Sequence, residues 1–409
     1  MSDDSAAAHP AFGPLAGLKV IDLSHVMAGP TCAMMLADMG ANVIKVEKIP
    51  GGDDTRRMEP PRIAGESAAF MMMNRGKRGI ALDLKQPAAK AVLHRLLEDA
   101  DVLIENYRAD TIARLGFGYP ELHARYPRLV YCSLSGFGRT GPYAERGGYD
   151  LIAQGMSGLM SITGEGPGRP PVKVGSPATD ITCGIIAAMG VLAALRHRDR
   201  TGVGQLVDTS LFEAGIVHTY WQSAICMATG VPPGPMGSAH PLNAPYQAFP
   251  TADGWITVGA ANQRNWERLL GVLGAEELNA DPRFASNPGR MANLAALEEI
   301  LSAKFRARSS ADWLAALEAA GVPAGPVLNV AEMHADPQTL ARGMVVETEH
   351  PVAGKVKAIG LPVKFSETPG RVAGPAPVLG QHTREVLAAH GFSAAEIAAM
   401  AASGAVGLG

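Results

Sequence analysis

The first 150 residues alternate short apolar runs with helical patterns. Runs that we interpret as strands lie at 18–23, 42–47, 79–84, 101–105 and 129–134, and helical patterns lie at 31–40 and 87–99. Because most positions in these runs are apolar, we expect strands that are buried on both faces. The alternation predicts an α/β fold with a parallel sheet and helices on both of its sides.

The pattern changes after residue 228. A proline-rich loop over 231–250 leads to a strand pattern at 255–259 and helical patterns at 263–273, 290–307 and 310–320. This mixture predicts a linker followed by a smaller α+β domain. The remaining residues carry helical patterns near 330–342 and 381–403. We therefore divide the chain into 1–228, 229–326 and 327–409.

The longest apolar run of the chain begins directly after Asp180. Residues 181–195 contain no charged side chain, which predicts a buried helix, and 151–160 reads as a second buried stretch. Asp180 would lie in the first turn, where unpaired N–H groups and the helix dipole favour the carboxylate while burial opposes it. A carboxylate that is ionised and shielded from water can act as a nucleophile. Position alone favours a plain N-cap instead.

Composition excludes several classes of protein. The 409 residues are 47% hydrophobic, which leaves room for two domains, and the net charge of -3 argues against a nucleic-acid or anionic-membrane partner. The 4 cysteines lack metal-binding spacing, so we expect no zinc site or disulfide framework and a reducing compartment. Residues 1–5 do not resemble a signal peptide, and 181–195 is shorter than the roughly 20 residues of a membrane span. These features predict a cytoplasmic protein.

Three loops are candidate ligand sites. The turn at 28–30 lies between a strand and a helix but lacks the three-glycine fingerprint, so a nicotinamide-dependent oxidoreductase is a weak alternative. The basic cluster 74–78 fits a phosphate site or a solvated surface equally well. Three further cations would join it: Lys85, Arg108 and Arg114. The glycine-rich loop 135–142 follows a strand, where α/β sheets bind ligands.

Taken in order, these segments resemble the class III CoA-transferases, the family of formyl-CoA transferase and carnitine CoA-transferase. The order and spacing of the matches carry the resemblance rather than any one motif, and the matching segments are 21–30, 40–47, 74–84, 105–107, 135–142, 148–150, 179–184, 200–205, 325–327 and 379–383. The resemblance implies a Rossmann-like large domain built from both chain ends, 1–228 completed by 327–409, with a small domain between. It also implies a homodimer of two interlocked subunits.

The resemblance implies roles for individual residues. Asp180 aligns with a nucleophilic aspartate that attacks an acyl-CoA thioester, giving a mixed anhydride and then an aspartyl-CoA thioester. This chemistry requires no metal or redox cofactor, because a carboxylate exchanges with a carboxylate. The coenzyme A contacts that it implies are His25, Val26, Met27, Ala28, Lys48, Leu82, Lys85, Asn106, Tyr107 and Arg114. We therefore predict transfer of CoA from an acyl-CoA, with succinyl-CoA as a candidate, to a small carboxylic or dicarboxylic acid.

Some residues depart from the family pattern and help to decide between the possible substrates and reactions. Ser135 stands where formyl-CoA transferase has lysine, and 245–249 replaces its glycine-run loop, which counts against formyl-CoA and oxalate as substrates. The related α-methylacyl-CoA racemases have a histidine where this chain has Tyr149. A tyrosine with a pKa near ~10 is a poor base at neutral pH, so racemisation is the weaker reading. A non-catalytic CoA-binding scaffold is a further alternative.

Overall fold

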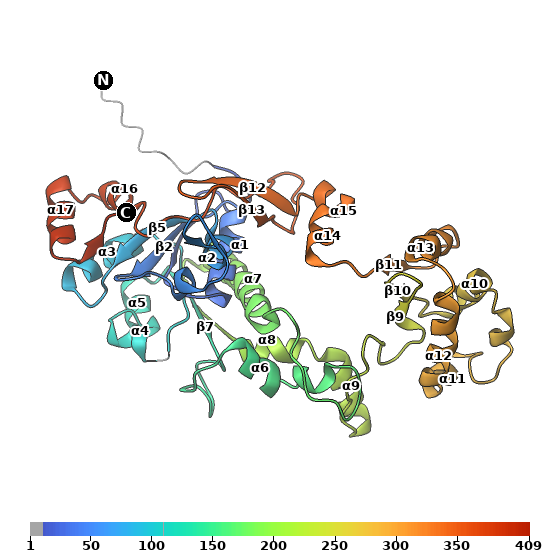
Figure 1. The fold of residues 1–409 in the computed structure, drawn as a ribbon. Coiled ribbons are helices and arrows are strands. Elements are labelled where there is room, and N and C mark those ends of the chain that lie inside the picture. The colour runs from blue at the N-terminus through green and yellow to red at the C-terminus, as the bar shows by residue number, and fades with distance from the viewer. Residues whose placement is uncertain (1–10, 109) are drawn as a thin grey trace. The chain divides into compact units, whose positions relative to one another are not determined.

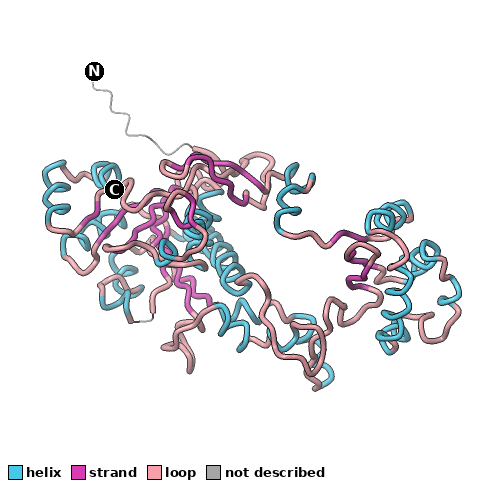
Figure 2. Tube along the Cα trace, in the orientation of Figure 1, coloured by secondary structure: helices cyan, strands magenta, loops and turns pink. Residues whose placement is uncertain are grey.

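The computed structural model describes residues 11–108 and 110–409 and contains two compact units (Figures 1 and 2). The first unit combines the chain up to Ser157 with Val174–His218 and Pro337–Gly409, and the second combines Gly158–Lys173 with Thr219–Asp336. Residues 1–5, which we expect not to form a signal peptide, lie outside the described residues. Gly158–Lys173 belongs to the second unit, where Gly237 N–H donates to the Gly164 carbonyl at 2.8 Å. The domain boundaries stay a prediction.

A seven-stranded sheet in the order β14-β5-β2-β1-β6-β7-β8 forms the centre of the first unit. The strands are β1 (Lys19–Asp22), β2 (Asn42–Lys48), β5 (Arg78–Leu82), β6 (Val102–Glu105), β7 (Val130–Ser135), β8 (Leu206–Ser210) and β14 (Val406–Gly407). All neighbours are parallel except β14, which runs antiparallel to β5. Ordered along the chain, the six parallel strands lie as 3-2-1-4-5-6, the arrangement of a doubly wound Rossmann sheet. The five expected strands are confirmed to within two residues, whereas β8 and β14 were not predicted.

Helices cover both faces of this sheet (Figure 1). On one face, α1 (Ala28–Asp38) and α7 (Ala178–Thr201) pack against side chains that include Val20, and on the other, Ile21 belongs to the core under α3 (Pro87–Leu97) and α5 (Tyr119–Arg125). The chain's C-terminal helices α16 (Thr383–Ala389) and α17 (Ala394–Ala402) contribute to that second core. The first unit is therefore built from both ends of the chain.

Shorter elements of the first unit connect these layers. They are η1 (Asp54–Arg57), β3 (Arg62–Ile63), β4 (Glu66–Ser67), α2 (Ala68–Asn74), α4 (Thr111–Arg114), α6 (Asp150–Met156), α8 (Leu211–Val217), α15 (Pro337–Ala341), β12 (Val345–His350) and β13 (Gly354–Ile359).

The expectation of two fully buried apolar stretches is partly wrong. Residues of α7 such as Cys183 and Val191 are buried, but Ile185 is 47% and Met189 64% exposed, and three large side chains of α6 are exposed as well. By length and composition α7 would also pass as a membrane span, which the shorter run 181–195 did not suggest. That is weak evidence, because the core helix of a soluble protein passes the same test and α7 packs on α1.

The second unit is a small α+β structure. Its antiparallel sheet has the order β11-β10-β9, formed by β9 (Tyr246–Pro250), β10 (Trp255–Gly259) and β11 (Ala324–Pro326). Its helices are η2 (Leu159–Ile162), α9 (Tyr220–Thr229), α10 (Gln263–Leu273), η3 (Glu276–Asn279), α11 (Asn287–Ala292), α12 (Leu294–Phe305), α13 (Ser310–Ala319) and α14 (Val330–Ala335). β9 lies within the region that we expected to be a loop. It ends at Pro250, and proline is tolerated at the end of a strand because no later strand residue depends on its missing N–H. The helical patterns at 290–307, 330–342 and 381–403 are each divided into two helices.

Candidate active site

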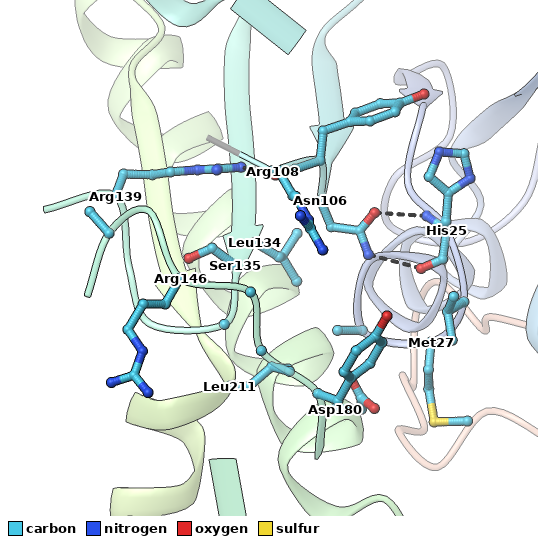
Figure 3. A pocket seen from close by; sticks show the side chains of 18 of the residues that line it. His25, Met27, Asn106, Arg108, Leu134, Ser135, Arg139, Arg146, Asp180 and Leu211 are labelled. Carbon is cyan, nitrogen blue, oxygen red and sulfur yellow. Dashed lines mark hydrogen bonds between the residues drawn. The ribbon is translucent and has the colours of Figure 1, made fainter. Parts of the chain in front are cut away.

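The carboxyl ends of β1, β6 and β7 meet at a cavity of about 300 Å³ (Figure 3). The order of the strands reverses between β1 and β6, and in open α/β sheets this reversal is where ligands bind. All of its lining residues belong to the first unit: His25–Ala28, Asn106–Arg108, Leu134–Gly136, Arg139, Ala144–Tyr149, Asp180 and Leu211.

The loop after β1 is held in one conformation at the edge of this cavity. His25 N–H donates to Asn106 Oδ1 and Asn106 Nδ2 donates to the His25 carbonyl, both at 2.8 Å, as Figure 3 shows. The Tyr107 ring lies edge-on to His25 with the centroids 4.9 Å apart. Val26 has a φ of +66°, a left-handed conformation that β-branched residues rarely adopt, and its N–H donates to Asp53 at 3.2 Å. The loop is therefore preformed before any ligand arrives.

A buried network of four charges lies beneath this loop. Lys45 Nζ lies 2.9 Å from Asp53 and donates to the Ser24 carbonyl at 2.8 Å, and Lys77 Nζ lies 2.8 Å from Asp22. Burial alone would raise the pKa of Asp22 and of Asp53, but Lys77 and Lys45 hold both well below the usual range. Asp22 also accepts the Ser24 N–H at 3.0 Å. The charges thus stabilise the backbone that leads into His25.

Asp180 is the third residue of α7 and is not its N-cap. The N-cap is Pro177, so the plain capping hypothesis is wrong. Asp150, the first residue of α6, takes over that function: it accepts hydrogen bonds from Thr179 N at 3.0 Å and Thr179 Oγ1 at 2.8 Å. Gln154 Nε2 holds its other oxygen at 2.7 Å. Among the described residues, none donates a hydrogen bond to the Asp180 carboxylate.

The electrostatic environment of Asp180 differs from that of an ordinary aspartate. Burial raises the pKa of Asp180 to about 7, and the neighbouring charge of Asp150 acts in the same direction. The expected stabilisation of the carboxylate by the helix N-terminus is therefore outweighed. A strongly perturbed acid in a cavity is a functional-site candidate.

Gly184 brings the start of α7 close to the loop after β1. A Cβ at this position would lie 2.5 Å from the Ala28 carbonyl oxygen and 2.6 Å from Thr31 Cβ, so a larger residue would push α7 away from α1. Because Gly184 lies about one helical turn after Asp180, this close contact sets where the carboxylate lies relative to 25–28.

A second cavity of about 370 Å³ lies at the carboxyl ends of β2 and β5. Its lining includes the predicted contacts Lys48, Leu82, Lys85 and Arg114, whereas His25–Ala28 and Asn106 line the cavity of Asp180. Tyr107 lines both cavities. The structure thus gathers all ten predicted contacts around two cavities with a shared wall, and their binding of coenzyme A stays a prediction.

The basic cluster 74–78 lines neither cavity. Arg75 pairs with Asp38 at 2.6 Å, Lys77 pairs with Asp22, and Arg78 pairs with Glu385 at 3.1 Å. These ion pairs favour a structural function over a phosphate site for the cluster.

Sequence analysis did not single out an arginine–glutamate pair that supports the cavity wall. Arg139 donates to both oxygens of the buried Glu105 at 2.9 and 3.2 Å, to Ser133 Oγ at 2.7 Å and to the Tyr107 carbonyl at 2.9 Å. Both partners lie in segments that match the family, and Glu105 is aligned with Ser133 in the register of β6 and β7. That register indicates the contact of Glu105 with Ser133 but gives no signal for Arg139, which lies in the loop after β7.

Comparisons with known proteins identify the family of this chain. Residues 15–383 match the model of CoA-transferase family III. The chain is 43% identical over 381 residues to the succinate–glutarate CoA-transferase of Agrobacterium fabrum, covering 92% of this chain and 95% of that protein. It is 41% identical over 355 residues to the acetyl-CoA:oxalate CoA-transferase of Acetobacter aceti, covering 87% and 90%. The crystal structure of a CaiB/BaiF family protein from Brucella suis superposes with a TM-score of 0.83 at 40% identity, covering 93% of this chain and 100% of that one. The chain therefore belongs to the class III CoA-transferases, enzymes that transfer CoA between acyl-CoA thioesters and carboxylic acids.

Proposed function

We propose that this CoA-transferase moves CoA from succinyl-CoA to a small dicarboxylic acid such as glutarate, through a covalent intermediate on Asp180. The observation that carries the proposal is the Asp180 carboxylate, which is partly buried, has no hydrogen-bond donor among the described residues and lines the cavity that also contains His25–Ala28. The name of the Agrobacterium relative supports the donor and acceptor. Because the Acetobacter relative named for oxalate lies at nearly the same identity, Ser135 and 245–249 do not decide the acceptor by themselves.

The chemistry follows from an exchange of carboxylates. An Asp180 oxygen attacks the thioester carbonyl carbon, the C–S bond breaks, and the CoA thiolate leaves a mixed anhydride behind. The thiolate then attacks the Asp180 carbonyl carbon and expels succinate, which gives the aspartyl-CoA thioester. The acceptor carboxylate reverses both steps and regenerates free Asp180. Water must be kept out, because it would hydrolyse the anhydride.

The two cavities offer places for the two ends of the CoA thioester. Lys48, Lys85 and Arg114 line the second cavity and offer positive charge to the phosphates of coenzyme A. Lys48 and Arg114 would exchange exposed, weak ion pairs with Asp54 and Asp110 for the phosphates. Tyr107 lies between these cations and the cavity of Asp180, where the thioester would react. His25 Nδ1 is buried without a partner among the described residues, so it can form a hydrogen bond with the bound thioester.

The exposed apolar face of the first unit supports the proposal of a homodimer. Leu151 and Ile152 of α6 are 52% and 45% exposed, and Ile185 and Met189 lie exposed on α7, which contacts α6. Side chains of this kind on one surface are typical of a subunit interface. We expect light scattering to give twice the chain mass of 42.6 kDa.

Intact-protein mass spectrometry after mixing with succinyl-CoA tests the covalent intermediate. Wild-type protein should gain a CoA-sized adduct, and Asp180→Ala should gain none. Asp312→Ala is a matched control, because Asp312 is also the third residue of its helix but is exposed and hydrogen-bonded to Ser309. Adduct on the Asp180→Ala protein would refute the proposed nucleophile. Exchange of the α-proton with deuterated water without any adduct would favour the racemase alternative.

A further inference from the structure

We propose that Arg108 determines acyl specificity by binding the free, non-reacting carboxylate of a dicarboxylic acyl group. This inference rests on the proposed function, since it names a residue that selects the substrates of the same site. Arg108 lies in the loop that follows β6 and lines the cavity of Asp180. In Figure 3 its side chain extends into the space between the strand ends.

Among the residues that the structure describes, Arg108 is the cation of this cavity with neither a carboxylate nor an aromatic ring against its guanidinium. Arg139 is bonded to Glu105, and the Arg146 guanidinium lies 4.6 Å from the centroid of the Tyr143 ring. Within residues 11–108 and 110–409, no ion pair and no side-chain hydrogen bond involves the Arg108 guanidinium. A guanidinium in this position is suited to a carboxylate, because its planar fork matches the two oxygens.

The position of Arg108 assigns it to the acyl end of the substrate. The three cations proposed for the CoA phosphates line the second cavity, and Arg108 is absent from that lining. It lines the cavity in which the acyl group would react with Asp180. The side chain lies against the Gly147 backbone, where a built Cβ would be 3.7 Å from Arg108 Nη2. The ligand of Arg108 is therefore expected on the acyl group rather than on the nucleotide.

The cavity holds two cations, Arg108 and Arg146, besides the paired Arg139. A succinyl or glutaryl group brings one free carboxylate that can pair with the Arg108 guanidinium, whereas a monocarboxylic acyl group leaves this guanidinium without a carboxylate.

The test compares two donors that differ only at the far end of the acyl chain. Succinyl-CoA and butyryl-CoA have four-carbon acyl groups that end in a carboxylate and a methyl group, respectively. The rate of adduct formation at subsaturating donor should fall about 10- to 100-fold for succinyl-CoA in Arg108→Gln, as expected for loss of a charge-assisted hydrogen bond. The rate with butyryl-CoA should change less than about twofold, and Arg108→Lys should recover part of the preference. Glutarate and pentanoate as acceptors should show the same split.

Controls separate this inference from the proposed function. Arg125→Gln, on the exposed face of α5 outside both cavities, should leave both donors unaffected. Equal slowing of both donors by Arg108→Gln would place Arg108 on CoA or the reacting centre and overturn the inference. Loss of the preference in Arg146→Gln instead of Arg108→Gln would overturn it too. If wild type forms adducts and Arg108→Gln keeps the preference, only the inference fails; if wild type forms none, the proposed function fails with it. Thermal unfolding of each variant verifies that it is folded.

Discussion

The rate at which Asp180 forms its CoA adduct should depend on pH in a way that reports its unusual pKa. Asp180 must be ionised to attack a thioester, and burial together with Asp150 raises its pKa to about 7. A group of pKa 7 is about 9% ionised at pH 6 and about 91% ionised at pH 8, so the rate should rise about tenfold between them. An aspartate at its ordinary pKa of 3.8 would give a flat profile over the same range.

Replacing Asp150 changes the cause of this shift directly. Asp150→Asn removes the like charge beside Asp180 but keeps an oxygen for the Thr179 N–H. The acid limb should move to lower pH, so the ratio of the rates at pH 8 and pH 6 should shrink. Two other groups nearby titrate differently: burial lowers the pKa of His25, and burial lowers the pKa of Lys77 to about 8. Replacing Asp150 should not change the part of the pH–rate profile that reports His25 or the part that reports Lys77.

The assay is rapid mixing with subsaturating succinyl-CoA, acid quench and intact mass at each pH, because the ratio of rate to affinity reports groups of the free enzyme. Buffers of constant ionic strength keep screening the same at each pH. A rate that is flat from pH 5 to pH 8 while adduct still forms would refute the assignment of a raised pKa to Asp180. A limb that stays in place in Asp150→Asn would refute the influence of Asp150.

Three further predictions concern stability and binding. The folded-state pKa of Asp180 lies above its unfolded value of 3.8, so the stability that it contributes is lost as pH rises towards 7; Asp180→Asn should therefore stabilise more at pH 8 than at pH 5, and equal shifts in Tm would contradict this. Gly184→Val should lower the free energy of unfolding by about 1–3 kcal/mol and slow adduct formation, because its Cβ would lie 2.5 Å from a carbonyl of α1; urea unfolding identical to wild type would count against the close helix contact. Lys85→Met should weaken CoA binding several-fold in calorimetry at low salt and less at high salt. Lys90→Met should leave CoA binding unchanged, because Lys90 lines neither CoA cavity. Equal effects of the two substitutions would show that Lys85 does not contact the CoA phosphates.

The sheet could be predicted because its central strands are apolar and buried on both faces. β7, for example, is buried at its first five positions, and four of these are apolar, which makes the run at 129–134 easy to recognise. β8 could not be recognised this way, because it is an edge strand whose first three residues are only partly buried or exposed. β14 has only two residues and is defined by its pairing with Leu82 and Ala81, partners more than 300 positions earlier.

The exposed apolar faces of α6 and α7 could not be predicted from the hydropathy of the sequence. Ile185 and Met189 lie in the same apolar run as the buried Cys183 and Val191, and the sequence contains no polar stripe that would separate the two faces. An apolar side chain that is buried in its own subunit and one that awaits a partner are identical in a hydropathy pattern. Only the three-dimensional packing of α7 on α1 distinguishes them.

The chemistry of Asp180 depends on a second aspartate that lies 30 positions earlier in the chain. The carboxylate oxygens of a capping aspartate accept hydrogen bonds from backbone N–H groups. These hydrogen bonds lower the pKa of the aspartate and make it a weaker base. Here Asp150 accepts the Thr179 N–H, so the Asp180 oxygens stay free of hydrogen bonds from the described residues. Burial, assisted by the same Asp150 charge, raises the pKa of Asp180 towards neutrality, where enough carboxylate is ionised and each ionised group remains reactive. Dividing capping and attack between two side chains is therefore what would allow a carboxylate at a helix start to serve as a nucleophile.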